Sequence, residues 1–122
     1  MGIVYAEVTV LPRDGTRGID LRLIVDTGSV LTWLPRPLLR ELGSIPTGRR
    51  TFRTINAMTP PKEVGEAPIR CLGLSGTVPV VFGDETDASV LGVTALEILG
   101  LTVDPNTGRL AREDVSLALA SA

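Results

Sequence analysis

Residues 23–29 read Leu-Ile-Val-Asp-Thr-Gly-Ser, and this stretch decides how the rest of the chain is interpreted. An apolar run ends abruptly in the carboxylate of Asp26, and three small residues follow that can hydrogen-bond a carboxylate: Thr27, Gly28 and Ser29. We expect a strand that turns into the core just before Asp26 and holds this acid in a tight, partly dry loop. An acid in such a position can transfer protons, so Asp26, Thr27, Gly28 and Ser29 are the candidate catalytic residues.

The composition is that of one folded domain. The 122 residues are 43% hydrophobic, 21% charged and 3% aromatic, so we expect a single domain over residues 1–122 with a core of Val, Leu, Ile and Ala. The net charge is −2 and the charges are scattered along the chain. Because nucleic-acid-binding proteins carry a basic patch or stripe, we expect no nucleic-acid partner.

The absence of some residue types excludes several kinds of catalytic site. The chain has no histidine and a single cysteine, Cys71. These counts exclude a Ser-His-Asp or Cys-His nucleophile system and an internal disulfide, and they argue against a typical zinc site. We expect no metal and no cofactor, and we interpret Cys71, inside an apolar strand, as a small buried hydrophobic residue.

The sequence shows no targeting or membrane-spanning pattern. Glu7 interrupts the first apolar stretch and no basic segment precedes it, unlike in a signal peptide. The longest stretch without charge, residues 71–83, contains Gly and Pro and is too short to span a bilayer. We expect a cytoplasmic protein that has no membrane partner.

Alternating hydrophobicity and turn residues predict a mostly β chain, a small barrel or sandwich. Residues 56–61 separate two of the predicted strands as a projecting hairpin, residues 74–76 are predicted to be a turn, and the tail 115–122 is either helical or frayed. The predicted strands cover residues 4–11, 19–25, 30–34, 49–55, 62–72, 77–82, 89–92, 101–103 and 109–111, and two short helices cover residues 35–42 and 93–99.

A single carboxylate is a poor catalyst of amide hydrolysis. The reaction needs a base to activate water and an acid to protonate the carbonyl oxygen and the leaving nitrogen. Two carboxyl groups about 3 Å apart supply both, because they share one proton. The sequence contains Asp-Thr-Gly only once, so the natural partner of Asp26 is Asp26 of a second, identical chain across a twofold axis.

The residues that follow Asp26 suit such a pairing. The Thr27 hydroxyl can lock the two loops together across the axis. Gly28 permits close backbone approach and unusual dihedral angles. The Ser29 hydroxyl can donate to a carboxylate oxygen and thereby favour its ionised form.

Residues 24–29, Ile-Val-Asp-Thr-Gly-Ser, resemble the active-site loop of the retropepsin-like aspartic proteases, the single-domain relatives of pepsin. A second signature of that family, two apolar residues and Gly ahead of a short helix, is matched by Val90, Leu91 and Gly92 before residues 93–99. The two motifs occur in the family's order, and the resemblance covers roughly residues 2–112.

The resemblance implies a small, closed, mostly β acid-protease barrel with one or two short helices, which acts as a homodimer. In such an enzyme Asp26 of each subunit would activate one water to hydrolyse a polypeptide, without a metal or a covalent intermediate. The strand that contains Val90, Leu91 and Gly92 would support the catalytic loop from beneath. Ser29 in place of the Ala of many retroviral members goes with a lower working pH, so we expect an acidic optimum.

The resemblance also implies a flap over the site, the hairpin around residues 53–62. Its tip lacks the glycines of retroviral flaps, and Pro60 and Pro61 stiffen one arm. Trp33 is either a core residue or part of the substrate pocket, and the basic residues Arg49, Arg50 and Arg53 form a solvated face and only secondarily a patch that steers substrate. The candidate substrate contacts are Ile55, Asn56, Ala57 and Met58 of the flap tip and Val25, Trp33, Val81 and Leu91 of the pocket walls.

Two other functions stay open. In one, Asp26, Thr27 and Gly28 form an ordinary turn in a generic β-barrel scaffold, because all three are turn formers. In the other, the chain is a catalytically silent, protease-like module that binds peptides or dimerises. The oligomeric state of the chain and the effect of replacing Asp26 distinguish these functions from an aspartic endopeptidase.

Overall fold

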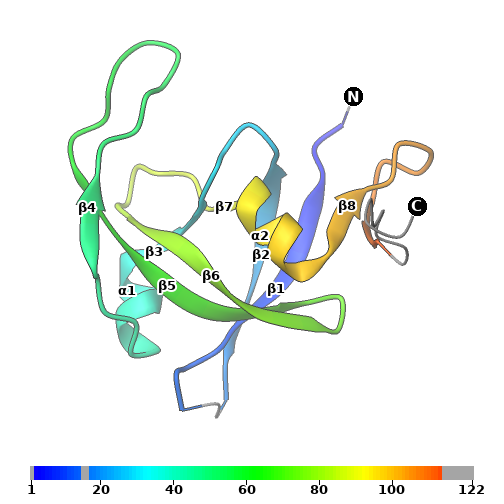
Figure 1. The fold of residues 1–122 in the computed structure, drawn as a ribbon, viewed down its shortest axis with the longest axis horizontal. Coiled ribbons are helices and arrows are strands. Elements are labelled where there is room, and N and C mark those ends of the chain that lie inside the picture. Colours follow the sequence, from blue (N-terminus) through cyan, green and yellow to red (C-terminus); the bar gives the residue numbers. More distant parts are fainter. Residues whose placement is uncertain (1, 15–16, 114–122) are drawn as a thin grey trace, which may run out of the picture.

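Strands dominate the structure, a computed structural model that describes residues 2–14 and 17–113 (Figure 1). The predicted mostly β class is confirmed, and the described residues also contain two short helices. In chain order the elements are β1 (Tyr5–Val10), β2 (Ile19–Asp26), β3 (Thr32–Pro35), α1 (Arg36–Glu41), β4 (Gly48–Arg50), β5 (Lys62–Cys71), β6 (Leu74–Gly83), β7 (Val90–Gly92), α2 (Val93–Leu99), β8 (Leu101–Val103) and β9 (Leu110–Arg112).

Six strands close into a barrel. Their hydrogen-bonded order is β1-β2-β7-β3-β6-β5, and β5 pairs back onto β1 to complete the ring. The strand β4 adds to β5 outside this ring, and β8 and β9 form a separate two-stranded sheet. Because the ring is closed, the structure is a barrel and not a sandwich. The predicted tail 115–122 lies outside the described residues.

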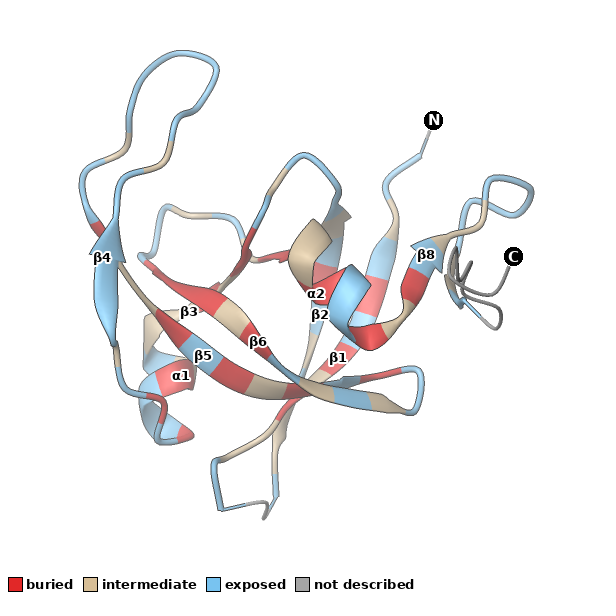
Figure 2. Ribbon diagram, viewed as in Figure 1, coloured by how far each residue is buried: buried red, intermediate tan, exposed pale blue. Residues whose placement is uncertain are grey.

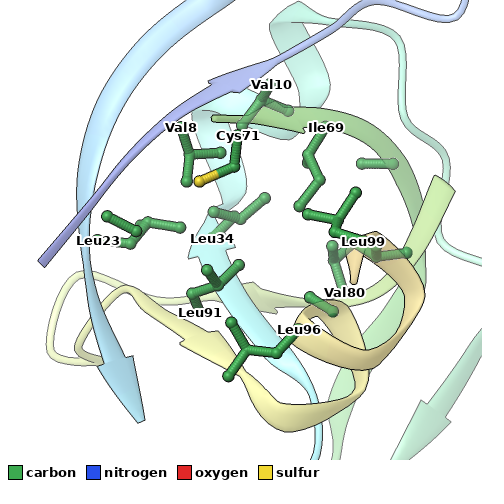
Figure 3. Packing of buried hydrophobic residues seen from close by; sticks show 14 of the residues in the cluster. Val8, Val10, Leu23, Leu34, Ile69, Cys71, Val80, Leu91, Leu96 and Leu99 are labelled. Atoms are coloured by element: carbon green, nitrogen blue, oxygen red, sulfur yellow. The ribbon is translucent and has the colours of Figure 1, made fainter. Parts of the chain in front are cut away.

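The core fills the inside of the barrel with aliphatic side chains (Figure 3). In β1 the residues Ala6, Val8 and Val10 are buried, whereas Tyr5 and Glu7 are exposed, as the pleat of a strand requires. Leu96 and Leu99 of α2 belong to the same cluster, Leu96 on the side of Leu91 and Leu99 on the side of Ile69 and Val80. The core has the expected composition, with Phe82 and Cys71 added to it.

Cys71 is buried at 2% exposure, as predicted. Burial raises the pKa of its thiol, and the nearby charge of Glu7 raises it further. A thiol with a raised pKa carries less thiolate at neutral pH and is a weaker nucleophile and metal ligand. Cys71 therefore contributes packing to this fold.

One strand crossing positions the loop that contains Asp26. The strand β7 lies between β2 and β3, parallel to β2 with Gly92 opposite Asp26 and antiparallel to β3 with Val90 opposite Trp33. The chain therefore leaves the barrel at the end of β2, turns through residues 27–31, and returns as β3 on the other side of β7. Both ends of the loop are held by the same short, buried strand.

The prediction of a turn at residues 74–76 is wrong. Those residues belong to β6. The turn lies directly before them, at Leu72 and Gly73, whose φ angles of 51° and 80° are both positive. Such a two-residue turn matches the twist of a β-hairpin, and β5 and β6 pair directly across it. A leucine is rarely found at positive φ, so the sequence pattern pointed to the Ser-Gly pair that follows.

The predicted strand over residues 49–55 is also shorter than expected. The strand β4 ends at Arg50, and residues 51–61 form a loop that projects from the barrel, closed by an isolated bridge between Arg53 and Met58. Figure 2 shows this projection as almost wholly exposed. Within the projection, the backbone bonds from Thr54 to Ala57 and from Thr59 to Phe52 accompany this bridge, and they are too few for a regular ladder.

Helix α2 has the predicted bounds. Gly100 ends it with a φ of 72°, a left-handed conformation that glycine adopts without strain. Within the residues that the structure describes, no helix is long and apolar enough to cross a membrane.

Candidate active site

Asp26 is the last residue of β2, and its side chain is exposed at the tip of the loop. The Gly28 amide donates to Asp26 Oδ1 at 3.0 Å, and the Ser29 amide donates to the Asp26 carbonyl oxygen at 3.1 Å. These two bonds make a tight turn directly after the acid. One oxygen of the carboxylate is fixed by a backbone donor.

The expectation that β2 turns into the core before Asp26 is wrong for the single chain. The strand keeps its alternation to the end, so Ile24 faces outward at 37% exposure opposite Tyr5 of β1. Asp26 therefore reaches solvent on the same outer face as Ile24. The partly dry environment that was expected for this acid is not provided by one chain alone.

The N-terminal end of α2 holds the loop in place. The amides of Val93 and Thr94 donate to the carbonyl oxygens of Ser29 and Val30 at 2.8 and 3.1 Å. The first amides of a helix have no partner inside it, and here the loop satisfies two of them. Within the barrel, the Gly92 amide donates to Thr32 Oγ1 at 3.0 Å in a buried bond.

Gly92 lies so close to the loop that no side chain fits. A Cβ atom at this position would be 2.3 Å from the Leu31 carbonyl oxygen and 2.8 Å from the Ser29 carbonyl oxygen. Both contacts are with backbone, which cannot rotate away. Val90, Leu91 and Gly92 thus lie directly against the loop that presents Asp26.

The Ser29 hydroxyl of the loop is arranged differently from the prediction. Ser29 Oγ donates to the Leu31 carbonyl oxygen at 2.7 Å, and not to the Asp26 carboxylate. Thr27 is exposed at the tip of the loop. Among the described residues, the group that donates to the Asp26 carboxylate is therefore the backbone amide of Gly28.

A cleft of about 520 Å³ opens beside Asp26. One wall is the loop itself, the floor includes Trp33 and Val90, and the opposite wall is the first arm of the projection after β4. Its lining residues are Asp26, Gly28, Ser29, Val30, Leu31, Trp33, Arg50, Thr51, Phe52, Arg53, Thr54, Asp87, Ala88 and Val90. A volume of this size is in the range of ligand-binding clefts.

An aromatic pair joins the floor of the cleft to the arm. The rings of Trp33 and Phe52 lie 5.2 Å apart at 58°, and the Arg50 guanidinium lies 5.6 Å from the centre of the Phe52 ring. Trp33 is half-buried and lines the cleft, so the structure favours the pocket alternative for this residue. This arm is tied to the returning arm of the projection by the Thr59 amide, which donates to the Phe52 carbonyl oxygen at 2.8 Å.

An ion cluster around the buried amine of Lys62 fixes the base of the projection. Lys62, the first residue of β5, is only 8% exposed and donates through Nζ to Asp84 Oδ2 at 2.8 Å and to Asp87 Oδ2 at 2.9 Å. The bonds to these carboxylates raise the pKa of Lys62, and Lys62 in turn lowers the pKa of Asp84. Arg36 joins the cluster through Asp84 Oδ1 at 3.8 Å and also forms an ion pair with Glu63.

Several predicted substrate contacts do not line the cleft. Val81 and Leu91 are completely buried in the barrel, and this burial rules out contact with a substrate. Val25 is half-buried, and it too is outside the cleft lining. The residues Ile55, Asn56, Ala57 and Met58 stand at the tip of the projection, beyond the cleft lining, with Ile55 fully exposed.

Five residues at the site were not predicted from the sequence or were given mainly another role there: Arg50, Phe52, Arg53, Lys62 and Asp87. Phe52 is one of only two phenylalanines in the chain, and an aromatic residue beside a predicted flap was a signal that could have been used. The ion cluster joins residues more than 20 positions apart in the sequence, so no local sequence pattern predicts it.

A second hollow, of about 600 Å³, lies at the other end of β2 around Arg17, Gly18 and Ile19 and contains none of the candidate residues. In the described ranges, no three His, Cys, Asp or Glu side chains are grouped so that they could hold a metal ion. No model of a known protein family matches the chain, and no curated protein matches it.

Proposed function

We propose that this protein is an aspartic endopeptidase that works as a homodimer and belongs with the retropepsin-like proteases. The observation that carries the proposal is the position of Asp26. Its carboxylate stands exposed at a tightly braced loop tip, beside a cleft whose opposite wall is a projecting hairpin. An acid with these neighbours can meet its own copy across a twofold axis while a substrate lies beside both.

The mechanism follows from the pair of carboxyl groups. Two Asp26 side chains about 3 Å apart share one proton, because like charges at that distance cannot both ionise. The ionised member takes a proton from water as the water attacks the peptide carbonyl carbon. The protonated member donates to the carbonyl oxygen, and a proton then passes to the leaving nitrogen.

The loop supplies the rigidity that this chemistry needs. The Gly28 amide at 3.0 Å orients one carboxylate oxygen, and the bonds from Val93 and Thr94 keep the loop from moving away from α2. A polypeptide substrate would lie extended between the loop and the flap, with an apolar side chain against Trp33 and Phe52. No cofactor enters this mechanism, and we place the enzyme in the cytoplasm.

Cleavage of an unfolded protein at pH 4–6 tests the proposal, in the range where carboxyl pairs titrate. The wild type should cut, and the Asp26→Asn variant should lose at least about a thousandfold in kcat/KM, because an amide can neither accept nor share the proton. Asp20→Asn, on the same strand but at the far end of β2, is the matched control and should cut normally. Equal cleavage by wild type and Asp26→Asn would refute the assignment.

A peptide-binding module without catalysis is the second candidate. It is favoured by one observation, that Ser29 donates to Leu31 and leaves Asp26 without a side-chain partner among the described residues. Under this function the cleft would bind extended peptides equally well in wild type and Asp26→Asn, and neither would cleave them.

A further inference from the structure

The cleft has a charge asymmetry that the catalytic acid does not explain. Two arginines, Arg50 and Arg53, line the arm wall. Across residues 2–14 and 17–113, neither of them lies within ion-pairing distance of a carboxylate, although Arg22, Arg36 and Lys62 all do. Two positive charges without a carboxylate partner therefore lie together on one wall of the cleft.

The other charged side chains of the cleft are already paired. Asp87 lines the cleft, but its carboxylate accepts from Lys62 Nζ and from the Asp84 amide at 2.9 and 2.8 Å. Lys62 itself lies 6.0 Å from the Trp33 ring and is held by two carboxylates. Apart from Asp26, the charged side chains of the cleft that have no ion-pair partner are therefore positive. They are Arg50 and Arg53, on the first arm of the projection after β4, which we call the flap arm.

The arm also positions one of these charges. The Arg50 guanidinium lies over Phe52, and Phe52 contacts Trp33 on the floor. A guanidinium stacked on a ring loses little freedom when it binds and keeps its N–H groups free to meet a carboxylate in a bidentate fashion. Arg49, the preceding residue of β4, is exposed but lies outside the cleft lining.

We infer that Arg50 and Arg53 select peptide substrates with an acidic side chain. The inference rests on the proposed function. It assigns to the flap arm a subsite for Asp or Glu, next to an apolar subsite formed by Trp33 and Phe52. The substrate class is thus an extended polypeptide in which an acidic residue flanks an apolar one.

The test uses peptides in which a single Glu is moved along the sequence, each paired with its Gln analogue, at pH 5.5, where a Glu side chain is mostly ionised. Cleavage gives kcat/KM. Peptide binding is measured in the Asp26→Asn variant as a change in the fluorescence of Trp33. This residue is the single tryptophan of the chain and lies in the cleft. Because binding is read without catalysis, the two proposals are tested separately.

At one position Glu should be preferred over Gln by about fivefold at low salt, in the range of partly exposed ion pairs. The preference should shrink in 0.5 M NaCl. In the double variant Arg50→Gln/Arg53→Gln the ratio should fall to about one, and in the control Arg49→Gln it should be retained.

The inference would be overturned if Glu were preferred over Gln at none of the positions. It would also be overturned if the preference survived in Arg50→Gln/Arg53→Gln or disappeared in Arg49→Gln. Cleavage without any Glu preference leaves the endopeptidase in place and removes the acidic subsite. A Glu preference in binding without cleavage by the wild type supports the subsite and contradicts the endopeptidase. A chain that neither binds nor cleaves any of the peptides contradicts both.

Discussion

At the scale of the residue, the position that the loop tolerates least is Gly92. Asp26 is exposed and its orientation depends on backbone contacts, so the shape of the loop decides where the carboxylate points. That shape is set by β7, which approaches the Leu31 and Ser29 carbonyl oxygens as closely as a glycine allows. A residue far from Asp26 in the sequence therefore controls its geometry.

Replacing Gly92 with Ala should unfold or displace the loop. A Cβ atom 2.3 Å from a carbonyl oxygen cannot be accommodated without a backbone shift, and we expect a loss of about 3 kcal/mol in the free energy of unfolding. Urea denaturation at a fixed protein concentration measures it. Gly48→Ala is the control, since its Cβ would meet only Val64 Cγ2 at 3.8 Å; a Gly92→Ala protein as stable as this control would show that the close packing has no structural role.

At the scale of the element, the flap arm is fixed at its base by charge and at its middle by aromatic contact. Lys62 joins the start of β5 to the loop of Asp84 and Asp87, and the Trp33–Phe52 contact joins the arm to β3. The Asp84 pKa is lowered by Lys62, so this carboxylate stays ionised down to pH values below its ordinary 3.8. We therefore expect the bond between Lys62 and Asp84 to persist in the acidic range proposed for catalysis.

The pH dependence of stability should report this cluster. A carboxylate with a lowered pKa stabilises the fold above its ordinary pKa of 3.8, and the contribution disappears as the pH falls through the lower folded value. The stability difference between wild type and Lys62→Met should thus be full at pH 5–6 and shrink below about pH 4. At the alkaline end the raised Lys62 pKa keeps the cluster up to pH values above 10.5.

Chemical denaturation from pH 2.5 to 7 measures this difference. Arg22→Met, which removes an exposed pair with Glu7, is the control and should change stability little at any pH. A Lys62→Met difference that stays constant from pH 6 to pH 3 would contradict the role given to Asp84.

The elements themselves were largely predictable from the sequence. The bounds of α2 follow from Gly100 after an apolar run, and the Asp-Pro-Asn-Thr-Gly stretch between the predicted strands 101–103 and 109–111 favours the turn of the β8–β9 hairpin. The position of the β5–β6 turn was not predictable, because Leu72 adopts a positive φ that its side chain disfavours. The exposure of Asp26 was missed because Ile24 is apolar yet faces outward, which a pattern of hydrophobicity cannot reveal.

At the scale of the molecule, apolar side chains surround the exposed acid. Ile24 is 37% exposed, Val30 60% and, on the neighbouring strand, Tyr5 50%. A second copy of the chain placed over this face would cover these residues and bring the two Asp26 loops together. The dimer would also supply the dry environment that the single chain does not give.

Ile24→Glu should weaken the dimer by at least tenfold in Kd, because it places a charge in the proposed interface. Sedimentation equilibrium over micromolar concentrations measures the change. Ile45→Glu is the control, since Ile45 is 64% exposed but lies outside the cleft lining and away from the Asp26 loop, and it should dimerise as the wild type does. If both variants dimerised with the same Kd, the dimer interface could not include Ile24, and the proposed position of the interface would be wrong.

The central claim is that one active site contains Asp26 from two chains, and mixing chains tests it most directly. Wild type is equilibrated with a ninefold excess of Asp26→Asn, and peptide cleavage is measured per wild-type chain. If the acids act in pairs, most wild-type chains join an inactive partner, and activity per wild-type chain falls to about one tenth by mass action. If each chain acts alone, activity per wild-type chain stays unchanged, and the paired-acid account is contradicted.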